Sequence, residues 1–466
     1  MPLEQLRIKM GKDRLTFTLM DLGYRKAGPV QIYDERTCYD NVAEGENPLI
    51  PFPTQLAVVT HAHMLRNSRH GEIYQQKANQ LIDAWLNSSL PSKVKLDGET
   101  VEELSPLQYS LFQDLDMVPF PGPENPRFTF IDLFAGIGGF RMAFQNLGGQ
   151  CVFSSEWDAQ AQRTYLANYG EVPFGDITLE QTKRFIPDDF DILCAGFPCQ
   201  AFSLAGKRLG FEETRGTLFF DVAEILRRKQ PKAFFLENVK GLAIHDKGRT
   251  LRTILNTLDE IGYDVVPPQI VNAMYFGVPQ HRERIYIVGF RRDLGINLAD
   301  FTYPEQNEVT KHFIDIREKD PVPAKYYLST TYVDTLIRHK ERHESKGNGF
   351  GYAIVGDNEV ANAIVVGGMG RERNIVIDTR QTDLTPTTRI KGEYNKDGWR
   401  RMTPREWGAL QGYPVYDNGD GSPVFQIPVA DVSAYKQFGN SVAVPAIQAT
   451  AQQLLNVLAN NNIIEL

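Results

Sequence analysis

Residues 131–140 read Ile131-Asp132-Leu133-Phe134-Ala135-Gly136-Ile137-Gly138-Gly139-Phe140. An apolar run that passes directly into glycines predicts a buried strand, a tight turn and then a helix, the arrangement in which backbone can approach a nucleotide closely. The Gly-Lys-Ser/Thr ending of a Walker loop is absent. Since many glycine-rich turns bind nothing, the strands that follow have to support this interpretation.

Short apolar runs alternate with helical patterns from Phe128 to about Arg292. This rhythm is typical of an α/β fold in which a parallel sheet is covered by helices on both faces. The expected strands cover residues 128–134, 150–154, 190–195, 233–236 and 285–290.

The ends of the next two expected strands carry residues suited to a nucleoside. Glu156 follows Gly136 by about twenty residues, the spacing at which an acid accepts hydrogen bonds from ribose hydroxyls. Trp157 beside it offers a face for an adenine ring. A third strand is expected to end near Asp176-Ile177, where a carboxylate and an apolar side chain suit the adenine base. Together with the glycine-rich turn, these residues predict one nucleoside pocket.

One cysteine stands apart from the others in Gly196-Phe197-Pro198-Cys199-Gln200, which follows the apolar run of residues 191–195. Cys199 is therefore expected at the carboxyl end of a strand, where open α/β sheets place their ligands. Pro198 stiffens the turn before it. A buried structural role is expected for Cys38, Cys151 and Cys194. The absence of a Cys-x-x-Cys pair argues against a disulfide framework and a structural zinc site.

An acid ends another expected strand in Phe235-Leu236-Glu237-Asn238-Val239, so Glu237 should share the crevice with Cys199. A thiolate that adds to carbon 6 of cytosine makes carbon 5 nucleophilic enough to accept a methyl group. A carboxylic acid with a raised pKa assists this addition by protonating ring nitrogen 3. The alternative for Glu237 is a helix N-cap or a surface acid.

With these residues in place, the chain resembles a cytosine-5 DNA methyltransferase that uses S-adenosylmethionine, of the kind found in type II restriction–modification systems. The family's motifs occur in their usual order from Phe130 to about Pro445. The resemblance implies a Rossmann-like methyltransferase domain, a smaller irregular target-recognition domain, and an N-terminal extension. It also implies that Cys199 is the nucleophile. The cofactor residues that it implies are Phe134, Gly136, Ile137, Gly138, Glu156, Trp157, Asp176, Ile177, Pro198, Leu218, Asn440 and Ser441.

Two arginines complete the expected catalytic set in Gln280-His281-Arg282-Glu283-Arg284, which matches the family's Gln-x-Arg-x-Arg motif. The resemblance implies that Arg282 reaches the target base and that Arg284 supports the active-site loops. Their spacing on a strand puts both on one face, and two cations near Cys199 would favour its thiolate. A solvated edge strand is the alternative.

Residues 200–216 combine glycines with cations, a composition suited to a mobile loop that closes on phosphates. Family members often carry a serine where this chain has Ala205, so we expect altered loop contacts without loss of activity. Further cations in the variable stretch before Arg400 suit readout of the major groove. The DNA contacts expected from both stretches are Gln200, Ser203, Lys207, Arg208, Arg215, Arg371, Arg373, Arg380, Arg389 and Lys391.

The domain boundaries follow from composition. The proline-rich segment 118–126 predicts a semi-rigid linker. We expect an N-terminal extension of unknown role over residues 1–120, a catalytic domain over 128–292 and 433–466, and a target-recognition domain over 293–432. A helix after Pro445 should pack back onto the sheet, and Thr403 with Pro404 should begin another helix.

Within the N-terminal extension, a strand at 15–19 and a helix around 74–86 are expected. His61 and His63 resemble a metal pair, but no carboxylate or cysteine cluster accompanies them. A surface or half-buried role is therefore expected for both histidines.

Composition bounds the remaining possibilities. A chain of 466 residues with 42% hydrophobic and 23% charged residues is typical of a globular protein of two or three domains. The net charge of −8 argues against a protein that coats nucleic acid, although it allows a local basic groove. No apolar run is long enough to span a membrane and no signal pattern begins the chain, so a cytoplasmic protein is expected.

The leading hypothesis is methyl transfer from S-adenosylmethionine to carbon 5 of a flipped-out cytosine in a short duplex DNA sequence, through a covalent bond between the cysteine and carbon 6. The chain would be a monomeric modification enzyme without metal or membrane partner, paired with a restriction endonuclease that acts on the same sequence. Two alternatives stay open. One is a tRNA cytosine-5 methyltransferase, and the other is a DNA-binding regulator that uses the methyltransferase body as a platform.

Overall fold

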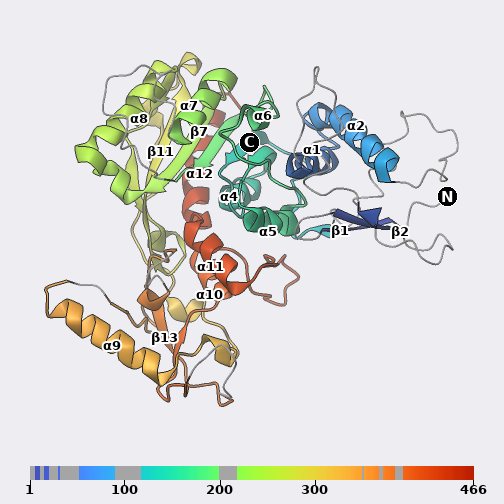
Figure 1. The fold of residues 1–466 in the computed structure, drawn as a ribbon. Helices are drawn as coiled ribbons and strands as arrows, with labels where there is room; N and C mark the ends of the chain where they lie inside the picture. The colour runs from blue at the N-terminus through green and yellow to red at the C-terminus, as the bar shows by residue number, and fades with distance from the viewer. Residues whose placement is uncertain are drawn as a thin grey trace.

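The computed structural model describes residues 6–10, 15–19, 30–31, 52–89, 117–198, 218–348, 351–366, 371–383 and 392–465. A larger lobe is built on a seven-stranded sheet, and a smaller lobe carries helix α9 (Thr330–Glu344) (Figure 1). In the described residues, no helix has both the length and the apolar composition needed to cross a membrane.

The sheet of the larger lobe contains all five expected strands. Its strands lie in the order β5-β4-β6-β7-β11-β8, and β9 also pairs with β11. Their bounds are β4 Phe128–Leu133, β5 Gly149–Ser155, β6 Ile192–Gly196, β7 Ala233–Val239, β8 Tyr263–Val265, β9 Gln269–Asn272 and β11 Glu283–Arg291.

The expected parallel sheet is confirmed for four strands, and one strand, β11, departs from it. Strands β5, β4, β6 and β7 are parallel, whereas β11 runs antiparallel to β7, β8 and β9. The strand expected to end near Asp176 is reduced to a single bridge between Ser155 and Phe174. The chain leaves β4 for β5 on one side and returns to β6 on the other, so a crevice opens at the carboxyl ends of β4 and β6.

Alternation along the strands divides the core into two layers. On β6, Ile192 and Cys194 face one cluster of buried side chains, while Leu193 and Ala195 face the other. The first face is covered by α4 (Gly139–Asn146), α5 (Ala159–Tyr169) and α12 (Val444–Asn460), and the second by α1 (Phe52–Met64), α7 (Leu218–Lys229) and α8 (Arg249–Glu260).

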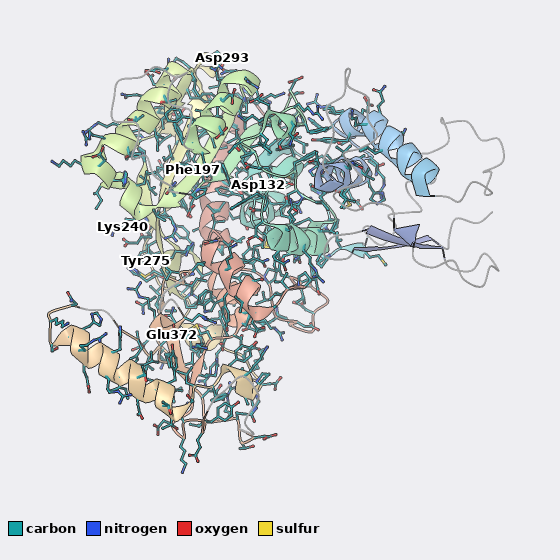
Figure 2. All side chains as sticks on the ribbon, in the orientation of Figure 1. Asp132, Phe197, Lys240, Tyr275, Asp293 and Glu372 are labelled. Carbon is teal, nitrogen blue, oxygen red and sulfur yellow. The ribbon has the colours of Figure 1, made fainter. Side chains whose placement is uncertain are left out.

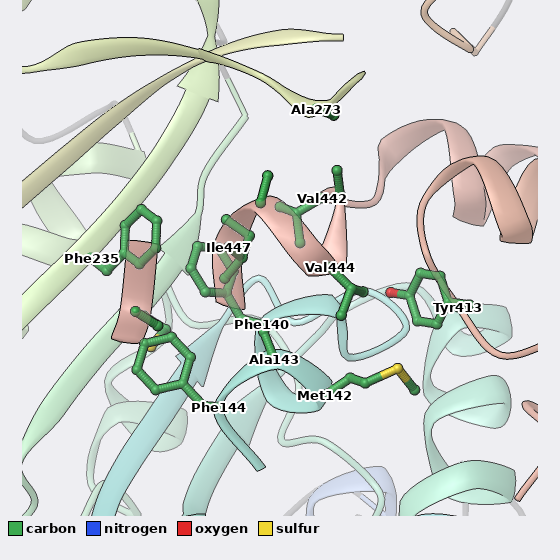
Figure 3. Packing of buried hydrophobic residues seen from close by; sticks show 14 of the residues in the cluster. Phe140, Met142, Ala143, Phe144, Phe235, Ala273, Tyr413, Val442, Val444 and Ile447 are labelled. Atoms are coloured by element: carbon green, nitrogen blue, oxygen red, sulfur yellow. The ribbon is translucent and has the colours of Figure 1, made fainter. Parts of the chain in front are cut away.

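The C-terminal helix α12 packs back onto the sheet, as expected. Its Ile447 lies close to Phe140 and Phe144 of α4, with Phe235 of β7 beside them (Figure 3). Phe140 and Phe235 meet edge to face at 5.3 Å between ring centroids. The start of α4, which follows the glycine-rich turn, is thereby fixed against the body of the sheet.

The N-terminal helices belong to this core, so the proline-rich segment does not separate them from the catalytic body. Helices α1 and α2 (Gly71–Ser89) bury Val58, Val59 and Tyr74 in the same cluster as β4 and β5. The hydroxyl of Tyr74 donates to the Val152 carbonyl at 2.8 Å. The expected helix around 74–86 lies within α2, and the expected strand at 15–19 is β2 (Leu15–Leu19) of a small sheet with β1 (Leu6–Met10) and β3 (Val30–Gln31).

His61 and His63 are both fully buried on α1, so the expected surface or half-buried position is wrong. The Nδ1–H of His61 donates to the Ala57 carbonyl at 2.8 Å, and its ring lies 4.8 Å from that of Phe174. Apolar spacing along a helix cannot show that a second layer covers its polar positions. Burial lowers the pKa of His61.

The smaller lobe has hydrophobic clusters of its own. Leu328, Val333, Leu336 and Ile375 form one cluster, between α9 and β13 (Ile375–Ile377). Strand β13 pairs with β14 (Trp399–Arg401), and β12 (Ala361–Asn362) pairs with β10 (Gln280–His281).

Fewer residues pack separately in this lobe than the expected range 293–432 contains. Phe301, Tyr303 and Phe313 on one side, and Trp407 and Leu410 on the other, belong to the main cluster. Helix α10 (Pro404–Leu410) begins as expected, with Thr403 as N-cap and a capping box to Glu406. Helix α11 (Asp431–Asn440) then leads into α12, and the short α6 (Glu180–Lys183) precedes β6.

Candidate active site

The turn after β4 is shaped by positive φ angles. Phe134 and Gly136 both have φ +56°, and Gly138 has φ +83°. A Cβ on Gly138 would lie 2.3 Å from the Tyr169 ring, whereas a Cβ on Gly136 would meet nothing within 4 Å. Gly138 is therefore required by packing, and the backbone at Gly136 is left open to the crevice.

Glu156 ties this turn to the end of β5. One carboxylate oxygen accepts a hydrogen bond from the Gly136 N–H at 2.9 Å, and the other accepts from the Asp158 N–H at 2.7 Å. Burial raises the pKa of Glu156, although these two N–H groups oppose the rise. Each oxygen keeps a further lone pair with which it can accept from a ligand hydroxyl.

A pocket opens beside this turn at the carboxyl edge of the sheet. It is lined by Phe134, Ser155, Glu156, Trp157, Gly175, Asp176, Ile177, Thr178, Pro198 and Leu218. The two aromatic faces and two carboxylates of the lining match the adenine, hydroxyl and amino groups of the expected S-adenosylmethionine, so these residues fit that cofactor.

Seven of the expected cofactor residues line the pocket, and the other five do not. Ile137 and Gly138 are buried within the turn, and Gly136 between β4 and Ile137 is half-buried. Asn440 is exposed, and the hydroxyl of Ser441 lies 2.8 Å from that of Tyr413, next to Gly139. Their roles toward the cofactor stay predictions. Sequence reasoning missed Ser155, Gly175 and Thr178, although each adjoins a residue that it named.

Glu237 is buried in the crevice, with 8% of its surface exposed, so it is neither a surface acid nor an N-cap. Its Oε1 lies 3.1 Å from the Arg284 Nε. Its backbone pairs with Gly196 of β6, three residues before Cys199. Burial raises the pKa of Glu237, while Arg284 and Arg282 oppose the rise. The site therefore favours a proton on this carboxyl more than water does.

The two arginines of the motif differ in their contacts, and their expected roles toward the target base and the loops stay predictions. Arg282 is 2% exposed, and its guanidinium donates to the carbonyls of Ile364, Gly439 and Ser441 at 3.1, 3.3 and 2.6 Å. A guanidinium that donates to three carbonyls from two segments holds those segments together. Arg284 is the arginine that forms an ion pair with Glu237, the expected catalytic acid. Because β11 is an interior strand, the edge-strand alternative is excluded.

Polar side chains that sequence reasoning did not single out hold this arrangement. The Asn238 amide donates to the Phe197 carbonyl at 2.8 Å, which fixes the backbone just before Pro198. The Gln280 amide donates to the Leu410 carbonyl at 2.8 Å and its oxygen accepts from the Ile364 N–H at 3.0 Å. Gln280 and Arg282 thus join the smaller lobe to the sheet.

Several expected site residues lie outside the described residues. They are Cys199, Gln200, Ser203, Lys207, Arg208, Arg215, Arg389 and Lys391, and Cys38 of the structural cysteines. The residues that flank the stretch 199–217, Pro198 and Leu218, both line the pocket. Cys151 and Cys194 are buried and free, as expected.

The expected DNA contacts of the smaller lobe differ in their surroundings. Arg373 is exposed and has no side-chain partner among the described residues. Arg371 is exposed and lies over the Tyr435 ring at 5.6 Å. Arg380 donates to Asp378 and to the Glu318 and Lys319 carbonyls. These contacts use the donors of Arg380 within the fold, which favours the alternative of an ordinary surface charge over DNA readout.

A sequence model described as "C-5 cytosine-specific DNA methylase" matches residues 128–456. The type II methyltransferase M.HpaII of Haemophilus parainfluenzae is 67% identical over 367 residues, which cover 78% of this chain and 98% of that protein. The type II methyltransferase M1.ScrFI of Lactococcus lactis subsp. cremoris is 46% identical over 345 residues, 74% of this chain and 82% of that protein.

Solved structures agree with the fold. The Dnmt2 methyltransferase of S. pombe has a TM-score of 0.51 at 20% identity, covering 72% of this chain and all of that one. The methyltransferase EhMeth of Entamoeba histolytica has a TM-score of 0.50 at 18% identity, covering 71% and 99%. At this identity the likeness supports the architecture of sheet and helices alone.

Proposed function

The chain belongs to the C-5 cytosine-specific DNA methylase family, and we propose that it methylates a flipped-out cytosine in a short duplex sequence through a covalent bond from Cys199. It is a DNA (cytosine-5-)-methyltransferase, and its cofactor, S-adenosylmethionine, supplies the methyl group. The observation that carries the proposal is the buried pair of Glu237 and Arg284 beside Gly196, at the edge where the cofactor pocket ends at Pro198.

The reaction begins with the cytosine. The Cys199 thiolate adds to carbon 6 while the Glu237 carboxylic acid donates its proton to ring nitrogen 3, so the added electron pair does not remain as charge on the base. Carbon 5 then takes the methyl group. The methyl donor is released as the neutral thioether S-adenosylhomocysteine. A base removes the proton from carbon 5 and the Cys199 thiolate leaves carbon 6. The proton on ring nitrogen 3 returns to the Glu237 carboxylate, which restores the aromatic ring and both side chains.

Glu237 suits this step because its surroundings stabilise both the neutral acid and the carboxylate that forms from it. Burial favours the neutral acid that donates. Once the proton has moved, Arg284 at 3.1 Å stabilises the carboxylate. Because the reacting carbons lie inside the base stack, the cytosine must leave the duplex, which costs a few kcal/mol. The cations of residues 200–216 would offset this cost by binding phosphates.

We further propose that the chain is the modification enzyme of a restriction–modification system and acts as a monomer. The names of the relatives support the first point, since several are type II methyltransferases. The partner would be an endonuclease that cuts the same sequence and need not contact this chain.

Bisulfite sequencing of plasmid DNA from cells that express the wild-type chain or the Cys199→Ser variant tests the proposal. We expect cytosines in one short motif to resist conversion with the wild type and to convert fully with the variant. Resistance that persists in the variant would remove Cys199 as nucleophile. Full conversion with soluble wild-type protein would transfer the proposal to tRNA as substrate, or to regulation without catalysis.

A further inference from the structure

A cationic turn follows the catalytic acid. Strand β7 ends at Val239, and two short 3-10 helices, η5 (Lys240–Ala243) and η6 (His245–Gly248), lead into α8. Residues 240–252 hold four lysines and arginines against one acid, Asp246, in a chain whose net charge is −8. This local excess of positive charge opposes the balance of the whole molecule.

The backbone of this turn is strained and held in place. Asp246 has φ 49° and ψ 47°, and Lys247 has φ 56° and ψ 34°, so two adjacent residues other than glycine are left-handed. Each such residue costs about 1 kcal/mol or more. The Asp246 carboxylate pairs with Arg249, and the His245 Nδ1 lies 2.7 Å from the Thr250 hydroxyl. Strain that is retained by local contacts points to a use for the resulting shape.

The turn exposes one apolar side chain and two cations. Ile244 is 79% exposed. Lys247 and Arg252 are exposed, and neither has a salt-bridge partner among the described residues, whereas the charge of Arg249 is paired with Asp246. The Arg252 guanidinium turns back over Gly248. Exposed isoleucine beside unpaired cations matches the alternation of deoxyribose and phosphate along a DNA strand.

The turn lies at the edge of the sheet that carries the chemistry. Val239, which precedes it, pairs with Arg284, and Lys240 Nζ lies 2.7 Å from a Glu283 carboxylate oxygen. In Figure 2, Lys240 and Tyr275 lie on the side of the larger lobe that faces the smaller lobe, where Glu372 is labelled. Duplex DNA whose cytosine reaches Glu237 would pass close to this edge.

We propose that Ile244, Lys247 and Arg252 form a backbone-binding turn for duplex DNA outside the methylated sequence. Lys247 and Arg252 bind consecutive phosphates, and Ile244 packs on the deoxyribose between them. This inference rests on the proposed function. Because phosphates and sugars carry no sequence information, the turn adds affinity and orientation without changing which sequence is methylated.

The test is the salt dependence of DNA binding. A fluorescein-labelled duplex that contains the methylated motif is titrated at several salt concentrations and followed by anisotropy. For Lys247→Asn combined with Arg252→Gln, the slope of log K against log salt should fall in magnitude by about 2, since each phosphate contact contributes roughly 0.9. Asparagine is chosen because it tolerates the left-handed backbone. Turnover at saturating DNA and the methylated motif should not change.

Two matched controls are available. Met117 is also 79% exposed, so Met117→Ser should leave DNA affinity unchanged, while Ile244→Ser weakens it several-fold with an unchanged slope. Arg163 is an exposed cation on α5, and Arg163→Ala should keep the wild-type slope. If the wild type binds and methylates DNA but the double variant keeps the wild-type slope, the inference about the turn is overturned and the proposed function is not. A wild type that does not bind the duplex would overturn the proposed function.

Discussion

Glu237 shows how one residue can serve both as a buried neutral acid and as part of an ion pair. Burial favours the proton, and Arg284 favours its loss. The net pKa is raised, so the acid form persists to higher pH than it would in water. For an acid with a raised pKa, the contribution of the protonated form is present at low pH and is lost as pH rises through the pKa of the folded state.

This leads to a prediction for the pH dependence of catalysis. Glu237→Gln should lower the single-turnover rate of methyl transfer by roughly a hundredfold or more, because the amide cannot give up a proton to the base. The wild-type rate should fall as pH rises through the pKa of Glu237, and the variant should lack that fall. The measurement is transfer of a tritiated methyl group to duplex DNA at a series of pH values.

Glu260→Gln is the control for this change, since Glu260 is an exposed acid at the end of α8. It should keep both the rate and the pH profile of the wild type. If Glu237→Gln retained the falling limb, another group would be the acid and Glu237 would only position Arg284.

The pair Arg282 and Arg284 marks a limit of inference from sequence at this scale. The spacing predicted that both lie on one face of a strand, whereas Arg282 lies between β10 and β11 and Arg284 lies on β11. The charges of both act on Glu237. The spacing could not reveal that the carbonyls of Ile364, Gly439 and Ser441, which lie far along the chain, converge on Arg282. Which arginine donates to backbone carbonyls depends on loop ends that lie together only in the folded chain.

At the scale of elements, the turn between β4 and α4 makes two similar glycines unequal. Gly138 and Gly136 both have positive φ, so an added Cβ is strained at either position. Only at Gly138 would the Cβ also collide with the Tyr169 ring, whose hydroxyl donates to the Gly138 carbonyl at 2.9 Å.

Gly138→Ala should therefore destabilise the protein by about 3 kcal/mol or more, and Gly136→Ala by about 1 kcal/mol. Thermal unfolding measures both, and calorimetric titration with S-adenosylmethionine measures the pocket. Gly136→Ala should fold and bind the cofactor more weakly, because the new methyl group enters the open side of the turn. Equal loss of stability in the two variants would contradict the packing explanation.

Sequence periodicity predicted those elements whose environment is uniform. The runs at 128–134 and 233–236 are apolar because both faces of their strands are covered, and the structure has β4 and β7 there. Strand direction was not accessible in this way. Strand β11 pairs antiparallel with β7 because the chain returns through β8 and β9, two strands too short and too mixed in composition to stand out.

At the scale of the whole molecule, the N-terminal helices are part of the body that they precede. Tyr74 on α2 is 1% exposed and donates to the carbonyls of Val152 at 2.8 Å and Phe185 at 3.2 Å. Val172, which lies beyond β5, donates its N–H to the Thr60 hydroxyl at 3.0 Å. The proline-rich composition of residues 118–126 could not show this, because it concerns the linking segment itself. It carries no information on which surfaces the N-terminal helices bury.

Removing the helices should therefore unfold the catalytic body. A chain that begins at residue 52 keeps α1, α2 and their contacts and should methylate DNA. One that begins at residue 90 should be insoluble, since it exposes the apolar face of Val152, Phe153 and Phe174 that the helices cover.

Point variants decide the matter if neither truncation is soluble. Tyr74→Ala should destabilise the full chain by about 3 kcal/mol or more, through lost packing and two unpaired carbonyls. Its neighbour Ile73 is 51% exposed, so Ile73→Ala should change stability by less than about 0.5 kcal/mol. Equal melting temperatures for the two variants in thermal unfolding would mean that the helices merely rest on the sheet.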